Sequence, residues 1–391
     1  MAESYEFIIV GSGLSGLNAA LTLQAAGREV LIIEANDKPG GRIATDKVDG
    51  YLCDRGFQLI NAKYPSLLSL NVIEEIDFIR APRVIEVALE NERHLIGDPR
   101  SAPLSILNKA TGTIPEKISL LRVLLSRAKP NQSIGGLLRT SGSCYERVLR
   151  PFLQGVFLID PDRVDARFGL SVLRSFVNGS PGLPRLGVGA LPQALAARVN
   201  NLNLNTRVDR ISGQTLETTQ GKFTAKKIIV ATDPTTAAQL LDLREGTPMA
   251  GCITWYHATS ENPSGSGRLV VDGQRRGPVY NSLVVSDISS SYAPKGQHLI
   301  SSTTGLGDTE SDVRRHLSIM WGVDTRDWNL IAKYEIPGAL PIHSVGKSLS
   351  QQIEITESIF VTGDHRTVPS QQGALFAGKL AAELAAELAL N

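Results

Sequence analysis

Three glycines near the start of the chain have the spacing of a loop that holds the phosphates of a nucleotide. Gly11, Gly13 and Gly16 form the pattern G-x-G-x-x-G. In this pattern the first glycine permits a tight turn, the second lets the backbone approach a pyrophosphate, and the third allows a helix to pack closely on a strand. The N-terminus of that helix offers N–H donors and a favourable dipole to the phosphates. These residues predict the binding of a dinucleotide.

A carboxylate follows at the place where such sites hold a ribose. Glu34 ends the apolar run VLIIE, and an acid about 20 residues beyond the glycines accepts hydrogen bonds from ribose hydroxyls. Its charge would repel a 2′-phosphate, which disfavours NADP. FAD and NAD both remain open at this point. The alternative interpretation is that the glycines serve only a turn and that Glu34 is a surface acid.

The surrounding segments predict the elements that would position these residues. Residues 6–10 are apolar and β-branched, and small and apolar residues recur at helical spacing over 14–26. Gly27 stands where a helix would stop, and residues 30–34 form a second short apolar run. The order strand, helix, strand is typical of a βαβ unit with a parallel sheet. The pattern is lost after residue 60 and returns near 185, so a second domain is expected within the first.

Residues 40–42, GGR, favour FAD. They follow the second predicted strand, where two glycines let the chain pass close to a pyrophosphate and Arg42 can neutralise it. With VGSGLSGLNAA and DGYLCDRGFQLI, this region resembles the FAD-binding region of the flavin-containing amine oxidase superfamily. The segments RPFLQGVFL (150–158), GVGALPQALA (187–196), VATDP (230–234) and GDHRTVPSQQGALFAG (363–378) resemble, in the same order, its phytoene-desaturase-like and protoporphyrinogen-oxidase-like branches.

The resemblance implies a set of cofactor-binding residues spread over the chain. Those implied for the pyrophosphate, the adenosine ribose and the phosphate region are Gly11, Gly13, Ser15, Gly16, Glu34, Ala35, Gly41 and Arg42. Those implied for the isoalloxazine ring, the adenine, and the second phosphate and ribityl contacts are Gly56, Phe57, Val208, Gly363 and Asp364. A final helix would begin with Gln371, Gln372, Gly373 and Ala374 and point its positive end at the flavin pyrimidine edge. The alternative is that Asp364 only caps an ordinary amphipathic helix.

The resemblance also implies the fold. It is an α/β fold in which a Rossmann-like FAD-binding domain of the glutathione-reductase-2 type is interleaved with an α+β substrate domain. The expected FAD-binding domain comprises residues 1–60, 185–249 and 336–391, and the substrate domain comprises 61–184 and 250–335.

Two features depart from the amine oxidases of that superfamily. Covalent monoamine oxidases link the flavin to a cysteine in the penultimate segment, whereas this chain has no cysteine after Cys252, so non-covalent FAD is expected. Those enzymes also have an aromatic residue shortly before the final helix, and here the stretch reads TVPSQQG. Simple amine oxidation is therefore disfavoured.

No catalytic side chain is assigned, because a flavin accepts hydride itself and the protein mainly positions the donor. His365 is interpreted either as a proton-transfer group or as a solvent-facing loop residue, and Arg55 either as a substrate anchor or as an ion-pair partner. Gln58 is expected to face the flavin. The aromatic residues that either line a pocket or fill the core are Trp255, Tyr256, Tyr280, Trp321, Trp328 and Tyr334. The six histidines lack metal-ligand spacing, so no metal is expected.

Composition limits the partners. The net charge of +1 gives no global field toward nucleic acid. Three dispersed cysteines fit a reducing compartment, and neither a secretory signal nor a run of about 20 apolar residues is present. A cytoplasmic protein is expected, with peripheral membrane contact left open: the helix predicted in IPEKISLLRVLLS leans either on a membrane or on its own domain.

The function expected is that of an FAD-dependent desaturase, dehydrogenase or oxidase acting on a lipophilic or polycyclic small molecule. The alternatives are an amine oxidase, an NAD-linked dehydrogenase, and a non-enzymatic carrier that resembles the GDP-dissociation-inhibitor and escort proteins. The substrate, the electron acceptor and the oligomeric state are left open.

Overall fold

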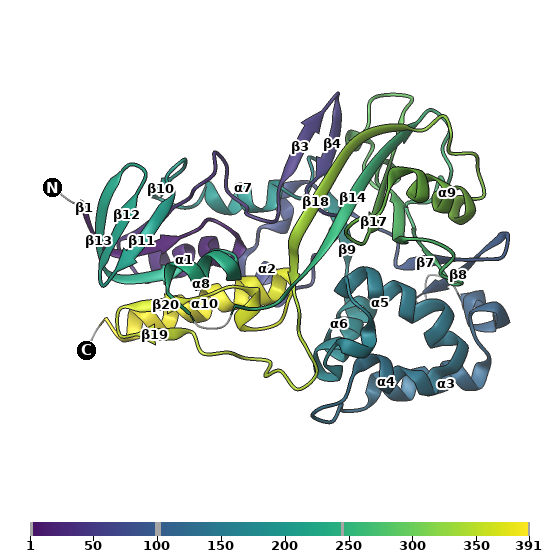
Figure 1. Cartoon of the computed structure of the whole chain (residues 1–391), viewed down its shortest axis with the longest axis horizontal. Helices are drawn as coiled ribbons and strands as arrows, with labels where there is room; N and C mark the ends of the chain where they lie inside the picture. Colours follow the sequence, from purple (N-terminus) through teal and green to yellow (C-terminus); the bar gives the residue numbers. More distant parts are fainter. Residues whose placement is uncertain (1–2, 98–102, 244–245, 390–391) are drawn as a thin grey trace.

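The computed structural model describes residues 3–97, 103–243 and 246–389, and two large sheets dominate it (Figure 1). The first sheet has eight strands among the described residues. Its main path is β10 (Leu202–Asn203), β2 (Val30–Ile33), β1 (Glu3–Val10), β13 (Gly221–Val230), β12 (Thr215–Thr218) and β11 (Val208–Ser212). Beside the end of β13 lie β20 (Ile359–Val361) and then β19 (Glu354–Thr356). β1 pairs in parallel with β2 and β13, as the βαβ pattern predicts.

The second sheet has seven strands in the described part of the chain and faces a different set of helices. Its order is β18 (Asn329–Pro341), β14 (Met249–Thr259), β17 (His298–Thr304), β16 (Val279–Val284), β15 (Leu269–Asp272), β7 (Val84–Leu89) and β8 (Glu92–Gly97). Helix α9 (Glu310–Trp321) packs on it around Trp255, Trp321 and Trp328. A separate group of helices comprises α3 (Ile114–Leu125), α4 (Ile134–Leu138), α5 (Arg150–Phe157) and α6 (Ala166–Asn178), and Figure 1 shows it at the lower right.

Short elements connect these layers. Two small sheets are formed by β3 (Thr45–Val48) with β4 (Tyr51–Asp54), and by β5 (Ile60–Asn61), β9 (Pro181–Pro184) and β6 (Phe78–Arg80). The remaining α-helices described are α1 (Leu14–Ala25), α2 (Pro65–Leu70), α7 (Ala190–Ala196), α8 (Pro234–Leu240) and α10 (Gln371–Glu387). A π-helical segment spans Cys144–Leu149, and 3-10 turns span Ile73–Ile76, Pro103–Leu107, Lys109–Thr111, Arg139–Ser141, Pro161–Arg163, Val285–Asp287, Ser290–Tyr292 and Asp364–Arg366.

Each large sheet draws its strands from widely separated segments of the chain, so strands of the two sheets alternate along the sequence. The boundary predicted at residue 336 falls inside β18, since that strand continues to Pro341. The division into an FAD-binding and a substrate domain otherwise stays a prediction. No helix in the described ranges combines the length and the apolarity needed to cross a bilayer.

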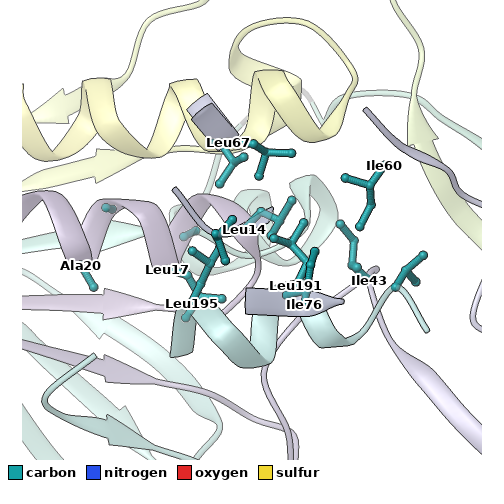
Figure 2. Packing of buried hydrophobic residues seen from close by; sticks show 14 of the residues in the cluster. Leu14, Leu17, Ala20, Ile43, Ile60, Leu67, Ile76, Leu191 and Leu195 are labelled. Atoms are coloured by element: carbon teal, nitrogen blue, oxygen red, sulfur yellow. The ribbon is translucent and has the colours of Figure 1, made fainter. Parts of the chain in front are cut away.

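Helices α1 and α10 are the two that carry the predicted phosphate and flavin contacts, and they lie side by side (Figure 1). Leu14 and Leu17 of α1 pack in one apolar cluster with Leu67, Leu191 and Leu195, as Figure 2 shows. The Asn18 side chain donates a hydrogen bond to the Leu375 carbonyl at 2.7 Å. A Cβ on Gly378 would lie 2.0 Å from the Ser15 carbonyl oxygen. This close approach fixes the N-terminus of α10 relative to the glycine turn.

Replacing Gly378 by alanine should therefore destabilise the protein even though alanine favours helix. Forcing α10 away from α1 should lower the free energy of unfolding by roughly 1–3 kcal/mol, the usual cost of overpacking. Urea unfolding of the variant measures this. Gly246→Ala is the control, because an added Cβ there meets nothing within 4 Å. Equal stability of the two variants would contradict the packing argument.

Candidate cofactor site

The glycine turn has one open position between two closed ones. Gly11 adopts φ +102°, and a Cβ on Gly16 would lie 2.0 Å from the Gly11 carbonyl oxygen, so both positions require glycine for the fold itself. A Cβ on Gly13 would meet nothing within 4 Å. Gly41 faces the same space, because its nearest neighbour would be the Gly13 Cα at 3.6 Å. Gly13 and Gly41 thus expose backbone to free space, as a pyrophosphate site requires.

Glu34 lies directly behind this turn and is buried. The Ser12 amide and hydroxyl both donate to its Oε2 at 2.8 Å. The Asn36 amide and side chain donate to its Oε1 at 2.9 and 2.7 Å. Glu34 is therefore not a surface acid, and its carboxylate is held rigidly against the glycine turn. Ser12 and Asn36 were not anticipated from the sequence.

The predicted adenine contact lies at the same end of the sheet. The Thr206 amide donates to the Glu34 carbonyl at 2.8 Å, and Val208 begins β11 two residues later, largely buried. Ala35, which follows Glu34, is exposed. Glu34, Ala35 and Val208 thus lie at the same end of the first sheet, and their contact with an adenosine stays a prediction.

Arg42 forms an ion pair with Asp364, from the opposite end of the chain. Its Nη2 donates to Asp364 Oδ1 at 2.6 Å, and its Nη1 donates to the Ala339 carbonyl at 3.1 Å. The Asp364 side chain is only 5% exposed, while that of Arg42 is 34% exposed. Asp364 is therefore not merely a helix cap. Arg42 already has an anionic partner, so its predicted phosphate contact would add to this pair.

Gly363 and Ser15 lie beside this ion pair. Gly363 adopts φ +146°, and an added Cβ would lie 2.6 Å from the His365 ring. The Ser15 hydroxyl is 3.0 Å from the Thr362 hydroxyl, which links the start of α1 to the end of β20. The first turn of α1 and the segment that leads to Asp364 are therefore directly linked.

Helix α10 begins at Gln371, as the sequence predicts. The Ser370 hydroxyl accepts from the Gly373 amide at 2.9 Å, so this N–H is already satisfied. A Cβ on Gly373 would lie 1.9 Å from the Val368 carbonyl oxygen, so the fold itself requires glycine at this position. Ala374 donates its amide to the Ser370 carbonyl. The first two amides, those of Gln371 and Gln372, are the ones at the open end of the helix.

The two glutamine side chains have different surroundings. Gln372 bonds to Ser66 twice, accepting from its amide at 3.1 Å and donating to its hydroxyl at 2.9 Å. Its side chain thus anchors α2, and only its backbone is available to a cofactor. Gln371 donates to Gln58 Oε1 at 3.3 Å, and Gln58 donates to the Arg42 carbonyl at 3.0 Å. Gln58 therefore lies within the predicted site, between Arg42 and α10.

Several buried polar atoms in this region have no partner within the described chain. They are Gln371 Oε1, both ring nitrogens of His365, and Arg366 Nε. Such atoms are costly unless a ligand or water satisfies them. Together with the open space at Gly13 and Gly41, they are the features expected of a site that holds a polar ligand.

His365 is buried, so its interpretation as a solvent-facing residue is wrong. Burial lowers the pKa of its imidazole to about 4, and the positive charges of Arg366, Arg42 and Lys347 act in the same direction against the opposing effect of Asp364. The ring is therefore neutral at pH 7. It can offer one N–H and one lone pair, but no positive charge.

Gly56 and Phe57 follow β4 and lie under the second sheet. Gly56 adopts φ +95°, and an added Cβ would lie 3.2 Å from Ile336 Cδ1. The Phe57 amide donates to the Thr254 hydroxyl at 3.3 Å. Arg55 instead turns outward and pairs with Asp46 at 2.6 Å, which supports its interpretation as an ion-pair partner.

Asp54, the last residue of β4 and two residues before Gly56, is the polar residue that sequence reasoning missed. It is fully enclosed and accepts from the Tyr292 hydroxyl at 2.8 Å, the Thr45 hydroxyl at 2.5 Å and the Val188 amide at 3.1 Å. The Tyr256 hydroxyl also bonds to its backbone at 3.0 Å. Asp54 thereby ties the loop before Gly56 to the second sheet. An acid at the end of the otherwise apolar strand YLCD was the sequence signal that could have pointed to Asp54.

Burial raises the pKa of Asp54 from 3.8 to about 6. Because the folded state holds this proton more tightly than the unfolded state, the group contributes stability below pH 4 that is lost as pH rises through 6. The free energy of unfolding of Asp54→Asn, relative to that of the wild type, should rise by up to about 3 kcal/mol between pH 4 and pH 7. Urea unfolding across this range measures the difference. Parallel pH curves for the two proteins would contradict it.

Of the six aromatic residues considered in the sequence analysis, most are packed in the protein and one lines a cavity. Trp255, Trp321 and Trp328 are core, and the Tyr256 and Tyr334 hydroxyls bond to the backbone of Asp54 and to Asp46. Tyr280 lines an open cavity of about 400 Å³ together with Gln154 and Pro151 of α5. Within the described ranges no cluster of three or more potential metal ligands occurs.

The chain was compared with protein families, curated proteins and solved structures. The family model for flavin-containing amine oxidoreductases matches residues 14–386. Chloroplastic protoporphyrinogen oxidase of Nicotiana tabacum is 25% identical over 191 residues, which cover 43% of this chain and 32% of that protein. Putrescine oxidase of Kocuria rosea is 45% identical over 65 residues, covering 17% and 14%. The matched regions thus span a third or less of these curated relatives.

The fold extends over the whole chain. A solved oxidoreductase from Methanosarcina mazei superposes with a TM-score of 0.75 at 15% identity, covering 97% of this chain and 100% of that one. The solved structure confirms the predicted α/β fold class, and the family match supports the predicted flavin cofactor and the class of flavin-dependent oxidoreductases. The chain belongs to the flavin-containing amine oxidoreductase family.

Proposed function

We propose that the protein binds FAD non-covalently and oxidises a lipophilic or polycyclic small molecule by hydride removal. The observation that carries the proposal is the ion pair between Arg42 and Asp364. It joins the loop after β2 to the segment before α10, beside the glutamines that begin that helix. A carrier protein without a flavin would have no evident use for this buried charge and the unpartnered polar atoms around it.

Non-covalent binding is supported by the surroundings of the cysteines. Cys53, Cys144 and Cys252 are all buried. Burial raises the thiol pKa of Cys53 to about 12 and those of Cys144 and Cys252 to about 11. Thiols of this kind are unreactive at neutral pH. None of them belongs to the segment 363–374 that approaches the predicted flavin.

The chain itself would bind and orient the reactants. Bound FAD would supply the hydride acceptor. Gly13 and Gly41 would leave room for the pyrophosphate, and Glu34 would hold the ribose. The open amides of Gln371 and Gln372 would favour negative charge at the adjoining edge of the cofactor. Neutral His365 would contribute a hydrogen bond without adding a positive charge.

The substrate proposal depends on what surrounds Gly56 and α10. Ile336 lies over Gly56, and residues 367–370 before α10 contain no aromatic side chain. An amine-binding aromatic cage would be incomplete, although putrescine oxidase is among the relatives. The relative named for a polycyclic substrate, protoporphyrinogen oxidase, matches over a longer stretch.

Anaerobic reduction of the FAD-loaded protein would test this substrate class. A panel would contain a reduced tetrapyrrole, a polyene, and small primary amines such as putrescine. We expect the flavin absorbance to bleach with a lipophilic compound and to remain unchanged with the amines. Bleaching by putrescine alone would establish the amine oxidase alternative. A protein that does not bind FAD would favour the alternative of a non-enzymatic carrier.

A further inference from the structure

Helix α3 exposes a continuous apolar ridge. The ridge consists of Ile114, Ile118, Leu121 and Leu125, whose spacing of four, three and four residues puts them on one face of the helix. Their side chains are 55%, 46%, 55% and 77% exposed. The helix is well formed without a partner on this face, because Thr113 and Glu116 make a reciprocal capping box.

The opposite face of α3 already has its packing partners. Val123 is buried, and Leu120 and Leu124 pack on the cluster formed by α4, α5 and α6. In Figure 1, α3 lies at the outer edge of this group of helices, away from the eight-stranded sheet. The ridge is therefore directed away from the core of its own domain. An exposed apolar row of this kind marks an interaction surface.

The segment that contains the ridge carries an excess of positive charge. Residues 103–178 carry eleven Lys and Arg and five Asp and Glu, a net charge of +6, while the whole chain carries only +1. All five acids have internal partners: Glu116 caps α3, and Glu146, Asp160, Asp162 and Asp165 pair with arginines. Arg122, Arg127 and Lys129 are exposed, and none forms an ion pair within the described residues.

We propose that the α3 ridge binds the surface of an anionic lipid bilayer. The four aliphatic side chains would enter the boundary between headgroups and acyl chains, and Arg122, Arg127 and Lys129 would contact lipid phosphates. An apolar helix face with a base on the same helix, Arg122, and two more directly after it, Arg127 and Lys129, has the composition of an interfacial helix. A second copy of this chain is a poorer occupant, because it would bring the same positive charge to the same face.

Vesicle sedimentation of the full-length protein tests the proposal. Vesicles of phosphatidylcholine with about one third phosphatidylglycerol should bind the wild type at least about tenfold more tightly than pure phosphatidylcholine. Salt at about 1 M should remove most of this preference. The binding does not depend on FAD or on substrate, so its failure would be distinct from failure of the proposed function.

Two variants separate the apolar and basic contributions. Ile118→Gln with Leu125→Gln should weaken binding to the anionic vesicles by about tenfold or more. Replacing the three bases by glutamine should abolish the preference for anionic lipid, because each base lost should lower the affinity for the anionic vesicles by about fivefold. The controls change equally exposed residues elsewhere: Leu186→Gln for the ridge, and Lys47→Gln, Arg210→Gln and Lys226→Gln for the bases.

Binding of the ridge variant equal to that of the wild type would overturn the proposal. So would a wild type that does not bind vesicles but sediments as a dimer that the ridge variant dissociates, because the occupant would then be a second copy. Circular dichroism before each assay verifies that the variants are folded.

Discussion

Replacing Gly13 by valine is expected to leave the protein folded and to weaken FAD binding by about 100-fold or more. Gly13 has φ −68° and ψ 176°, a conformation open to any residue. A Cβ there would enter space that no atom of the chain occupies within 4 Å. The valine would therefore fill the room meant for the pyrophosphate without disturbing the turn.

Gly16→Val is the matched comparison. An added Cβ would lie 2.0 Å from the Gly11 carbonyl oxygen, so this variant should lose stability with or without FAD. Thermal unfolding of both apoproteins, followed by FAD titration monitored by flavin fluorescence, separates the two effects. Wild-type FAD affinity in a folded Gly13→Val protein would show that the cofactor does not lie against this turn.

Removing Arg42 is expected to cost more stability than removing its partner. Arg42→Met leaves the Asp364 carboxylate, 5% exposed, without a counterion. This should lower the free energy of unfolding by about 3 kcal/mol, the lower end of the range for a broken buried pair, because Arg42 itself is partly exposed. Asp364→Asn should cost less, since the remaining guanidinium can reach water. The double variant should recover part of the loss.

Arg55→Met is the control for that pair, because Arg55 also binds an aspartate at 2.6 Å but is 49% exposed. It should change stability by no more than about 1 kcal/mol. Urea unfolding with and without FAD measures all four variants. If Arg42 also contacts the cofactor, FAD will increase the difference in free energy of unfolding between the wild type and Arg42→Met. An Arg42→Met protein as stable as Arg55→Met would contradict the assigned role.

The elements of the first sheet could be predicted from the sequence because local patterns determine them. The strand at 6–10, the helix from Leu14 and its end near Gly27 appear as expected. Gly11 is required by its backbone conformation and Gly16 by close packing, as their spacing suggested. The start of α10 at Gln371 was also correct, since its position follows from the resemblance.

Contacts between distant segments could not be derived in this way. Arg42 and Asp364 are 322 residues apart, so no periodicity or spacing relates them. Gln372 looked like a flavin contact, yet its side chain caps α2 through Ser66. Helix α3 is apolar on two faces, and its pattern alone did not show which face was packed.

The central claim is that this chain holds FAD without a covalent bond at the site formed by Gly13, Glu34, Arg42 and Asp364. The visible spectrum of the purified protein, supplemented with FAD and then freed of excess, tests it most directly when repeated on the filtrate after denaturation. We expect a flavin band on the native protein that passes entirely into the filtrate. A colourless protein that does not take up FAD, or a flavin that stays with the denatured chain, would contradict it.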